Sequence, residues 1–266
     1  MNIHAHPTKK IGAKIRPDHV KTCKLSKYID LSKFPNPPPT VDWSVKAPKS
    51  TQLFKNDEIG DCAVAGYLHH KEIVLQSAGF GITFADPTAV EIYKWATKEA
   101  NGEAYNEENP STDTGLVLVD FLEGLRRRGL ILAHAQVDLD NDREVQIARW
   151  LYGGLYRGFD LPDFAQQLDD VWYIPRHPQG SKEAGSWGGH CVNDKARLAD
   201  GSIQVTSWGK TITVKPDFLK KYQGDAHIII HRHSPQAFQS LFITSKHDKD
   251  GVALKDLQSD LNKLHK

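Results

Sequence analysis

Apolar residues recur every three or four positions between residues 63 and 152, and this spacing predicts amphipathic helices. Asp86 and Pro87 mark one helix start, because Asp caps a helix and Pro fits its first turn. The Arg126-Arg127-Arg128-Gly129 run marks a helix end, where cations meet the negative end of the helix dipole and glycine stops the helix. We expect helices over residues 63–78, from residue 86, from residue 112 to 128 and over residues 142–152.

Beyond Gly153-Gly154 the pattern changes to short runs rich in β-branched and aromatic residues, which predict strands. Asp200-Gly201 lies between two of these runs and suits a tight hairpin turn. Helices first and antiparallel strands afterwards indicate an α+β fold. The expected strands are residues 155–161, 190–198, 203–208, 211–214 and 226–231.

Both ends of the chain differ from its middle. Residues 1–39 read as a basic, Pro-rich N-terminal arm, because the Pro37-Pro38-Pro39 run excludes a helix and fixes an extended path. Residues 40–235 are expected to form the folded domain. Residues 236–266 form a C-terminal extension whose apolar spacing predicts a short amphipathic helix, suited to docking either on its own domain or on a partner protein.

The net charge of +1 is unevenly distributed along the chain. Residues 1–27 carry seven Lys and Arg residues against Asp18 alone, a charge of +6, which leaves −5 for the rest. A basic arm can bind an acidic protein surface or nucleic acid, and it can also be a solvated tail. We expect the solvated tail. The arm lacks interleaved aromatic residues and an RNA-binding signature, so nucleic acid is not expected as a partner.

The sequence contains no run of about 18 apolar residues, so no membrane partner is expected. The first 16 residues lack the apolar stretch of a secretory signal, which favours a cytoplasmic location. Cys23, Cys62 and Cys191 are too few for a disulfide framework and fit a reducing compartment. Neither CxxC nor HExxH occurs, so we expect no metal and no cofactor.

Cys62 is the candidate nucleophile of the chain. A thiolate nucleophile needs a lowered pKa, a nearby base and donors for the oxyanion. Cys62 immediately precedes the first expected helix, whose positive end would favour the thiolate. His190, 128 residues later, opens an expected strand and is the candidate base. Cys191 would point to the opposite face of that strand, as a thiol of the core.

Several motifs around these residues resemble papain-like (C1-type) cysteine peptidases. Val41-Asp42-Trp43, Lys55-Asn56 and Gly60-Asp61-Cys62 resemble the start of the mature enzymes, and Gly189-His190 with Ser207-Trp208-Gly209 resembles the family's histidine strand and N-S-W-G motif. The similarity keeps the family's order and spacing over residues 40–232 and looks closest to a divergent bacterial and phage branch. It implies two lobes with the active site in the cleft between them. A helical lobe at about residues 45–135 would pack against an antiparallel β lobe at about residues 136–235.

The resemblance also assigns roles to single residues. Cys62 would attack a carbonyl, and His190 would protonate the leaving group. Asn56, six residues before Cys62, matches the family's oxyanion-hole glutamine, and Thr206 matches the asparagine that orients the histidine. Both replacements are shorter than the family's residues. A regular hairpin register would pair Thr206 with Lys195, some distance along the strand from His190.

Two functions fit this pattern. The first is a cysteine hydrolase that cleaves peptide or amide bonds of a peptide or protein substrate through an acyl-enzyme. The alternative is a catalytically weak or inactive papain-like module with a structural or binding role, for example in a phage particle. The basic arm or the C-terminal helix would then bind an assembly partner. Cys62 and His190 at the family spacing favour the hydrolase, since a scaffold does not need that pair.

The other histidines carry weaker signals. His69 and His70 follow Cys62 on the first expected helix, and we expect them on the surface. His231 and His233 alternate at the end of a strand, as a metal pair would, but no cysteine or carboxylate cluster lies near them in the sequence. We therefore expect no metal there.

Overall fold

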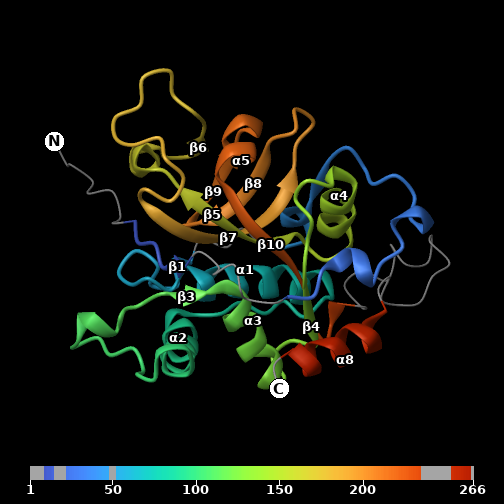
Figure 1. Ribbon diagram of the computed structural model, residues 1–266, viewed down its shortest axis with the longest axis horizontal. Helices are drawn as coiled ribbons and strands as arrows, with labels where there is room; N and C mark the ends of the chain where they lie inside the picture. The colour runs from blue at the N-terminus through green and yellow to red at the C-terminus, as the bar shows by residue number, and fades with distance from the viewer. Residues whose placement is uncertain (1–8, 15–21, 48–51, 235–252, 265–266) are drawn as a thin grey trace.

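The computed structural model describes residues 9–14, 22–47, 52–234 and 253–264. The helices are α1 (Cys62–Ser77), α2 (Asp86–Asn101), α3 (Leu118–Arg127), α4 (Asp142–Leu151), α5 (Pro216–Tyr222) and α8 (Leu254–Leu264). The strands are β1 (Ala13–Lys14), β2 (Val41–Asp42), β3 (Leu116–Val117), β4 (Ala133–Gln136), β5 (Leu155–Leu161), β6 (Val171–Trp172), β7 (Gly188–Arg197), β8 (Ile203–Ser207), β9 (Lys210–Val214) and β10 (Gln223–Ile230). Helices α1, α2 and α3 lie on one side of the long strands, while β6, β8, β9 and α5 lie on the other (Figure 1). This is the expected α+β fold of two lobes.

The main sheet has the strand order β4-β10-β5-β7-β8-β9-β6. Neighbouring strands along this path are antiparallel, except that β6 and β9 are parallel. The short strands β1, β2 and β3 lie off the path, and both β1 and β2 pair with β7. Strand β7 therefore joins the sheet to segments from the N-terminal part of the chain.

Helix α1 is buried along nearly its whole length and packs against β7. Gly66 lets the two elements approach closely, because a Cβ at this position would lie 3.1 Å from Cys191 Sγ. The Tyr156 hydroxyl on β5 donates a hydrogen bond to the Ala63 carbonyl at 2.9 Å. These contacts hold the start of α1, and with it Cys62, against the middle of the sheet.

The expected strands are all present, with bounds that differ by at most a few residues. The predicted start of the third helix is wrong. Helix α3 begins at Leu118, and the residues before it form a turn and β3. Gly115 has a φ of 66°, which is outside the helical region. Asp113 accepts the Gly60 N–H at 3.0 Å, so a contact from a distant loop overrides the local helix pattern. Strand β4 and helix α5 were not expected from the sequence.

The described residues 22–34 are part of the folded core and do not form a solvated tail. Their apolar side chains share one cluster with Leu257 and Leu261 of α8, both 0 % exposed. Asp260 of α8 accepts a hydrogen bond from the Tyr28 hydroxyl at 2.9 Å. The C-terminal helix therefore docks on its own domain. The members of this cluster from the arm are Cys23, Leu25, Tyr28, Ile29 and Phe34.

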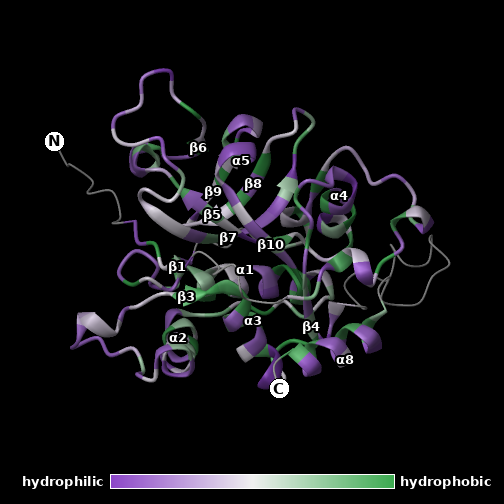
Figure 2. Ribbon diagram, viewed as in Figure 1, coloured by the Kyte–Doolittle hydropathy of each residue, from purple (hydrophilic) through white to green (hydrophobic). Residues whose placement is uncertain are grey.

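The hydropathy of the chain follows this architecture. Figure 2 shows β3 in hydrophobic colours inside the fold, and the long loop between β6 and β7 mostly in hydrophilic colours at its edge. Among the described residues, no helix is both long enough and apolar enough to cross a membrane.

Candidate active site

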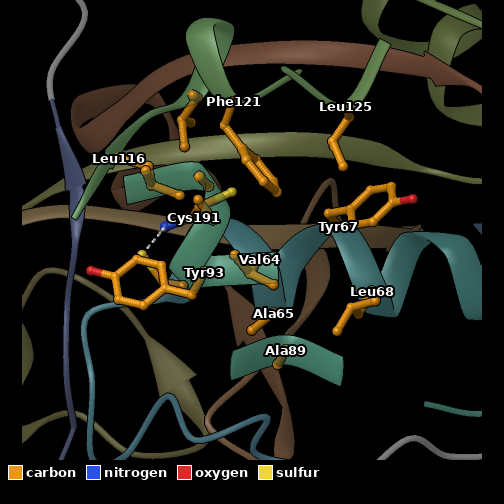
Figure 3. Packing of buried hydrophobic residues seen from close by; sticks show 14 of the residues in the cluster. Val64, Ala65, Tyr67, Leu68, Ala89, Tyr93, Leu116, Phe121, Leu125 and Cys191 are labelled. Carbon is orange, nitrogen blue, oxygen red and sulfur yellow. Dashed lines mark hydrogen bonds between the residues drawn. The ribbon is translucent and has the colours of Figure 1, made fainter. Parts of the chain in front are cut away.

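Cys62 is the first residue of α1 and is 0 % exposed. The backbone N–H of Cys191 donates a hydrogen bond to Cys62 Sγ at 3.4 Å, drawn as the dashed line in Figure 3. Cys191 directly follows His190 on β7. The fold thus brings the expected nucleophile against the peptide unit next to the expected base, although the two are far apart in the sequence.

The His190 ring lies in an aromatic and hydroxyl environment. It stacks on the Trp208 ring with a centroid distance of 4.1 Å and an angle of 13° between the planes. Its Nε2 lies 2.6 Å from Ser207 Oγ, and its Nδ1 has no hydrogen-bond partner among the described residues. Nε2 is therefore held by a hydroxyl, while Nδ1 is buried.

Ser207, and not Thr206, is the hydrogen-bond partner of His190. Thr206 pairs with Asn193 instead of Lys195, because the hairpin register is offset by one residue and a bulge between Asp194 and Ala196 adds a second. Side chains alternate between the two faces of a strand, which puts Ser207 on the face that carries His190. Thr206 lies on the other face and lines a small cavity together with His69 and Lys195. The orienting contact expected of Thr206 is made by its neighbour.

Asn56 is buried near the start of α1, and its side chain is engaged within its own turn. Its Nδ2 donates to the Ile59 carbonyl at 3.3 Å. Its backbone carbonyl accepts the Lys10 N–H at 3.3 Å. The role of Asn56 as an oxyanion donor remains a prediction, since that role needs the amide to turn toward Cys62.

The N-terminal residues 9–14, which we name the arm segment, lie across Cys62. Strand β1 of this segment pairs in parallel with β3 through Ala13 and Leu116, and pairs antiparallel with β7 through Ala13 and Gly189. The Leu116 N–H donates to the Gly12 carbonyl at 2.8 Å. The backbone N–H groups of Gly12 and Ala13 lie near Cys62 and favour the charged form of its thiol. The arm segment therefore presents amide protons to the sulfur, in place of a carbonyl carbon that the sulfur could attack.

Glycines on both sides make room for the arm segment. A Cβ on Gly12 would lie 1.8 Å from the Gly60 carbonyl oxygen. A Cβ on Gly115 would lie 2.0 Å from the Gly12 carbonyl oxygen, and one on Gly189 would lie 2.0 Å from the Ala13 carbonyl oxygen. Such distances are far below van der Waals contact. The cleft is therefore a narrow slot that an extended backbone fills.

A hydrogen-bonded clamp sets the width of this slot. Asp113 accepts the Gly60 N–H at 3.0 Å and the Tyr93 hydroxyl at 2.7 Å. The Tyr93 oxygen in turn accepts the Gly115 N–H at 2.9 Å. Neither Asp113 nor Tyr93 was predicted as a site residue. The signal that the sequence offers is the position of Asp113 two residues before Gly115, a glycine that marks a turn.

Burial keeps Cys62 and His190 uncharged in this conformation. Burial raises the pKa of Cys62 to about 12, although three backbone N–H groups directed at the sulfur oppose this effect. Burial lowers the pKa of His190 to about 3. A thiol and a neutral imidazole are therefore the stable forms while the arm segment covers the site.

His69 and His70 are buried, and the expectation that they lie on the surface is wrong. His70 Nδ1 lies 3.1 Å from Nε2 of His231, and burial lowers the pKa of His70 to about 4. Within the described part of the chain, no group of three or more His, Cys, Asp or Glu residues could hold a metal ion. The His70–His231 contact is a buried neutral pair.

Comparisons with known proteins agree with this geometry at the level of the fold. No family model matches the sequence, and no curated protein matches it. The structure is similar to xylellain, a cysteine protease from Xylella fastidiosa, with a TM-score of 0.62 and 13% identity over 85% of this chain and 98% of that chain. It also matches the cysteine protease and lectin-like domains of Cwp84, a surface layer associated protein of Clostridium difficile. That match has a TM-score of 0.43 and 11% identity, over 83% of this chain and 55% of that chain. The similarity to xylellain shows that the fold is that of a papain-like cysteine protease.

Proposed function

We propose that the protein is a cysteine hydrolase that cleaves peptide or amide bonds, with Cys62 as the nucleophile and His190 as the acid and base. One observation carries this proposal. Cys62 lies at the start of α1 against the His190–Cys191 peptide unit, and the His190 ring is fixed through Nε2 while Nδ1 has no hydrogen-bond partner among the described residues. Acyl transfer requires a base beside the nucleophile, and we infer that Nδ1 of His190 faces Sγ of Cys62 in the reacting state.

The proposed reaction proceeds in two halves. The Cys62 thiolate attacks the substrate carbonyl carbon, and the protonated His190 ring gives its proton to the leaving amine as the C–N bond breaks. A thioester to Cys62 remains. Water then attacks the thioester carbonyl while His190 accepts a proton from it, and the carboxylic acid leaves as the C–S bond breaks. Ser207 holds the ring orientation through both halves.

The described conformation is, in this proposal, a latent one. The arm segment occupies the slot and excludes water from the sulfur, and burial then favours the neutral thiol. Departure of the arm segment would expose Cys62, reduce the desolvation and open the slot to a substrate backbone. The sequence motifs support the narrower assignment to the C1-type family, in a bacterial or phage branch, with the cytoplasm or a phage particle as the location.

The experiment displaces the arm segment within the full chain. Gly12→Val should expel it, because a Cβ on Gly12 would meet the Gly60 carbonyl oxygen at 1.8 Å. Iodoacetamide at pH 6 should then modify Cys62 faster than Cys23 and Cys191. Its rate with Cys62 should be at least about tenfold higher in Gly12→Val than in the unmodified chain. Turnover of a broad peptide library should appear in Gly12→Val and vanish when Cys62→Ala is added.

The alternative function predicts a different outcome. A papain-like module with a structural role would show no turnover in Gly12→Val, and all three cysteines would react at similar rates. Circular dichroism of each variant would confirm that the fold is intact. Those results together would reject the hydrolase.

A further inference from the structure

Asp61 is a buried carboxyl, directly before Cys62, that the proposed reaction does not yet use. Its residue is 0 % exposed. Asp61 is the N-cap of α1, but its side chain makes no capping hydrogen bond. Neither carboxyl oxygen forms a hydrogen bond of ordinary geometry among the described residues. Burial of such a group costs free energy, so its place beside the nucleophile needs an explanation.

The surroundings of this carboxyl favour its neutral form. Burial raises the pKa of Asp61 well above its ordinary value. The Asn56 side chain opposes this rise, while the nearby carboxyls of Asp113 and Asp86 add to it. Asp113 accepts hydrogen bonds as a carboxylate does, including one from the Tyr93 hydroxyl at 2.7 Å. A second negative charge beside it would be repelled, so the Asp61 carboxyl keeps its proton.

Further titratable groups that sense the charge of Asp61 are the Cys62 thiol and the hydroxyls of Tyr93 and Tyr105. None of these three groups can become a cation that would compensate an ionised Asp61. They belong to α1, to α2 and to the loop after α2, and not to the arm segment. The carboxyl therefore keeps these neighbours when the arm segment leaves the slot.

The loop that carries Asn56 is fixed through its backbone. Phe54 and Lys55 have φ values of 55° and 68°, a left-handed conformation that costs free energy in residues other than glycine. Phe54 is 0 % exposed, and its ring lies against the His69 ring with a centroid distance of 4.8 Å. The Asn56 N–H donates to the Leu53 carbonyl at 3.0 Å. Packing holds this strained backbone in place, so the freedom that remains to Asn56 is in its side chain.

The Asn56 amide is weakly held in the described conformation. Its Nδ2 donates to the Ile59 carbonyl at 3.3 Å, which is long for a hydrogen bond of this type. The same side chain lies near Asp61 and favours the charged form of that carboxyl, as an N–H donor does. Nδ2 is therefore turned toward Ile59 and Asp61. A half turn about χ2 exchanges the nitrogen and oxygen of an asparagine amide without any change in the backbone.

The charge of Asp61 decides which end of this amide it attracts. An ionised carboxylate only accepts hydrogen bonds, so it would hold Nδ2. A neutral carboxyl has one O–H donor, which Asn56 Oδ1 can accept. With Oδ1 held in this way, Nδ2 points away from the carboxyl, and its N–H groups become available to another acceptor.

We propose that Asp61 is a positioning residue of the oxyanion hole. In the reacting state its neutral carboxyl donates to Asn56 Oδ1, and Nδ2 then faces the oxygen that becomes negative when Cys62 attacks a carbonyl. The inference rests on the proposed function, because the oxyanion forms only in acyl transfer. It gives the buried carboxyl a task, since its O–H turns the amide that the latent conformation holds the other way.

The kinetic test uses the full chain with Gly12→Val, in which the slot is free. Asn56→Ala should lower kcat by about 10²-fold with little change in KM, because it removes an oxyanion donor. Asp61→Leu keeps a similar shape without the O–H and should lower kcat by at least about tenfold. Asp61→Asn keeps a donor at the same place and should recover kcat to within about threefold of the Gly12→Val chain. Asp61→Leu added to Asn56→Ala should cause no further loss, since both residues act through one donor.

The matched controls are Asp57→Leu and Asp57→Asn, which remove a half-buried carboxyl from the same loop. Both should leave kcat within about twofold of the Gly12→Val chain. Losses that add up in the double variant of Asp61 and Asn56 would overturn the positioning role. An Asp61→Asn chain as slow as Asp61→Leu would overturn it as well. If Asp61→Leu does not fold, as judged by circular dichroism, the infrared measurement carries the test.

That measurement compares the Gly12→Val chain with and without Asp61→Asn by infrared difference spectroscopy at pH 7. The difference should contain the C=O band of a protonated carboxyl, and a carboxylate band in its place would overturn the proposal.

NMR of the Asn56 side-chain amide separates positioning from chemistry. In the full chain with Cys62→Ala and Gly12→Val, its resonances should shift in Asp61→Leu and stay in place in Asp57→Leu. That result without turnover in the Gly12→Val chain would keep the contact between Asp61 and Asn56 and reject the hydrolase together with its oxyanion hole. Turnover that Asp61→Leu does not slow would reject the positioning role alone.

Discussion

Two of the buried histidine clusters in the described part of the chain differ in their surroundings. His190 stacks on Trp208 and contacts Ser207, and the N–H of the next residue, Cys191, donates to Cys62. The second cluster consists of His70 and His231, whose ring nitrogens lie 3.1 Å apart. Burial lowers the pKa of the histidines in both clusters.

The difference shows that burial and a lowered pKa do not by themselves identify a catalytic histidine. Both clusters are removed from solvent, and in both the neutral ring is favoured. Of the two, the first adjoins Cys62, the start of α1 and the slot that an extended backbone fills. The second joins α1 to the residue that follows β10.

The largest expected difference between the two clusters appears when one histidine ring is removed from each of them in the Gly12→Val background. His190→Gln should lower kcat by about 10² to 10⁴, because it removes general acid and base catalysis. His70→Gln should leave kcat within about twofold and lower the free energy of unfolding by about 1 to 3 kcal/mol. Peptide turnover and urea denaturation measure the two quantities. A large loss of kcat in His70→Gln would show that the clusters are not separate in function.

The pH dependence of the free energy of unfolding tests whether the His70–His231 pair is neutral in the folded protein. Buried His70 has a folded-state pKa of about 4, below the ordinary value near 6.5, so the unfolded chain binds more protons between these values. The stability is therefore fully present above about pH 6.5 and is lost as the pH falls, by up to about 1.4 kcal/mol per pH unit for each such histidine. Urea denaturation between pH 7.5 and 4.5 measures this slope.

The matched variants for that experiment are His70→Gln and His177→Gln. His70→Gln should flatten the dependence on pH, because it removes a group that the unfolded state protonates. His177 is exposed, and its replacement should leave the slope unchanged. The same slope in the unmodified chain and in His70→Gln would contradict the assignment of a buried neutral pair.

The smallest expected effect concerns the contact that orients His190. In the Gly12→Val background, Ser207→Ala should lower kcat by about tenfold with little change in KM, because an unfixed ring is correctly placed for less of the time. Thr206→Val keeps the shape of the neighbouring side chain, which lies on the other face of β8, and should leave kcat unchanged. The reverse result would return the orienting role to Thr206.

The sequence predicted the longer strands, β5 and β7 to β10, because local signals define them. Strand β5 begins after Gly153-Gly154 and ends before Pro162, and its apolar run needs no tertiary information. The predicted start of α3 was wrong because Asp113 forms hydrogen bonds with Gly60 and Tyr93, which lie far away in the sequence. A tertiary contact of this kind leaves no periodic pattern.

The candidate site was predictable in part for the same reason. Cys62 and His190 belong to motifs with a fixed spacing, and the structure brings Cys62 against the residue that follows His190. Thr206 pairs with Asn193, which lies on the face of β7 opposite to His190, so the alternation of side chains puts Ser207 beside the histidine. The position of the arm segment could not be predicted, because its pairing uses backbone groups and any sequence carries those.

The clamp of Asp113, Tyr93, Gly60 and Gly115 has a consequence for the kinetics of activation. The clamp ties the two walls of the slot to each other and not to the arm segment, so the walls keep their spacing when that segment leaves. Opening is then a local event whose free energy is far below that of global unfolding. In hydrogen exchange, the amide of Leu116, which donates to Gly12, should lose its protection with the arm segment, while the amides of α1 exchange only when the whole domain unfolds.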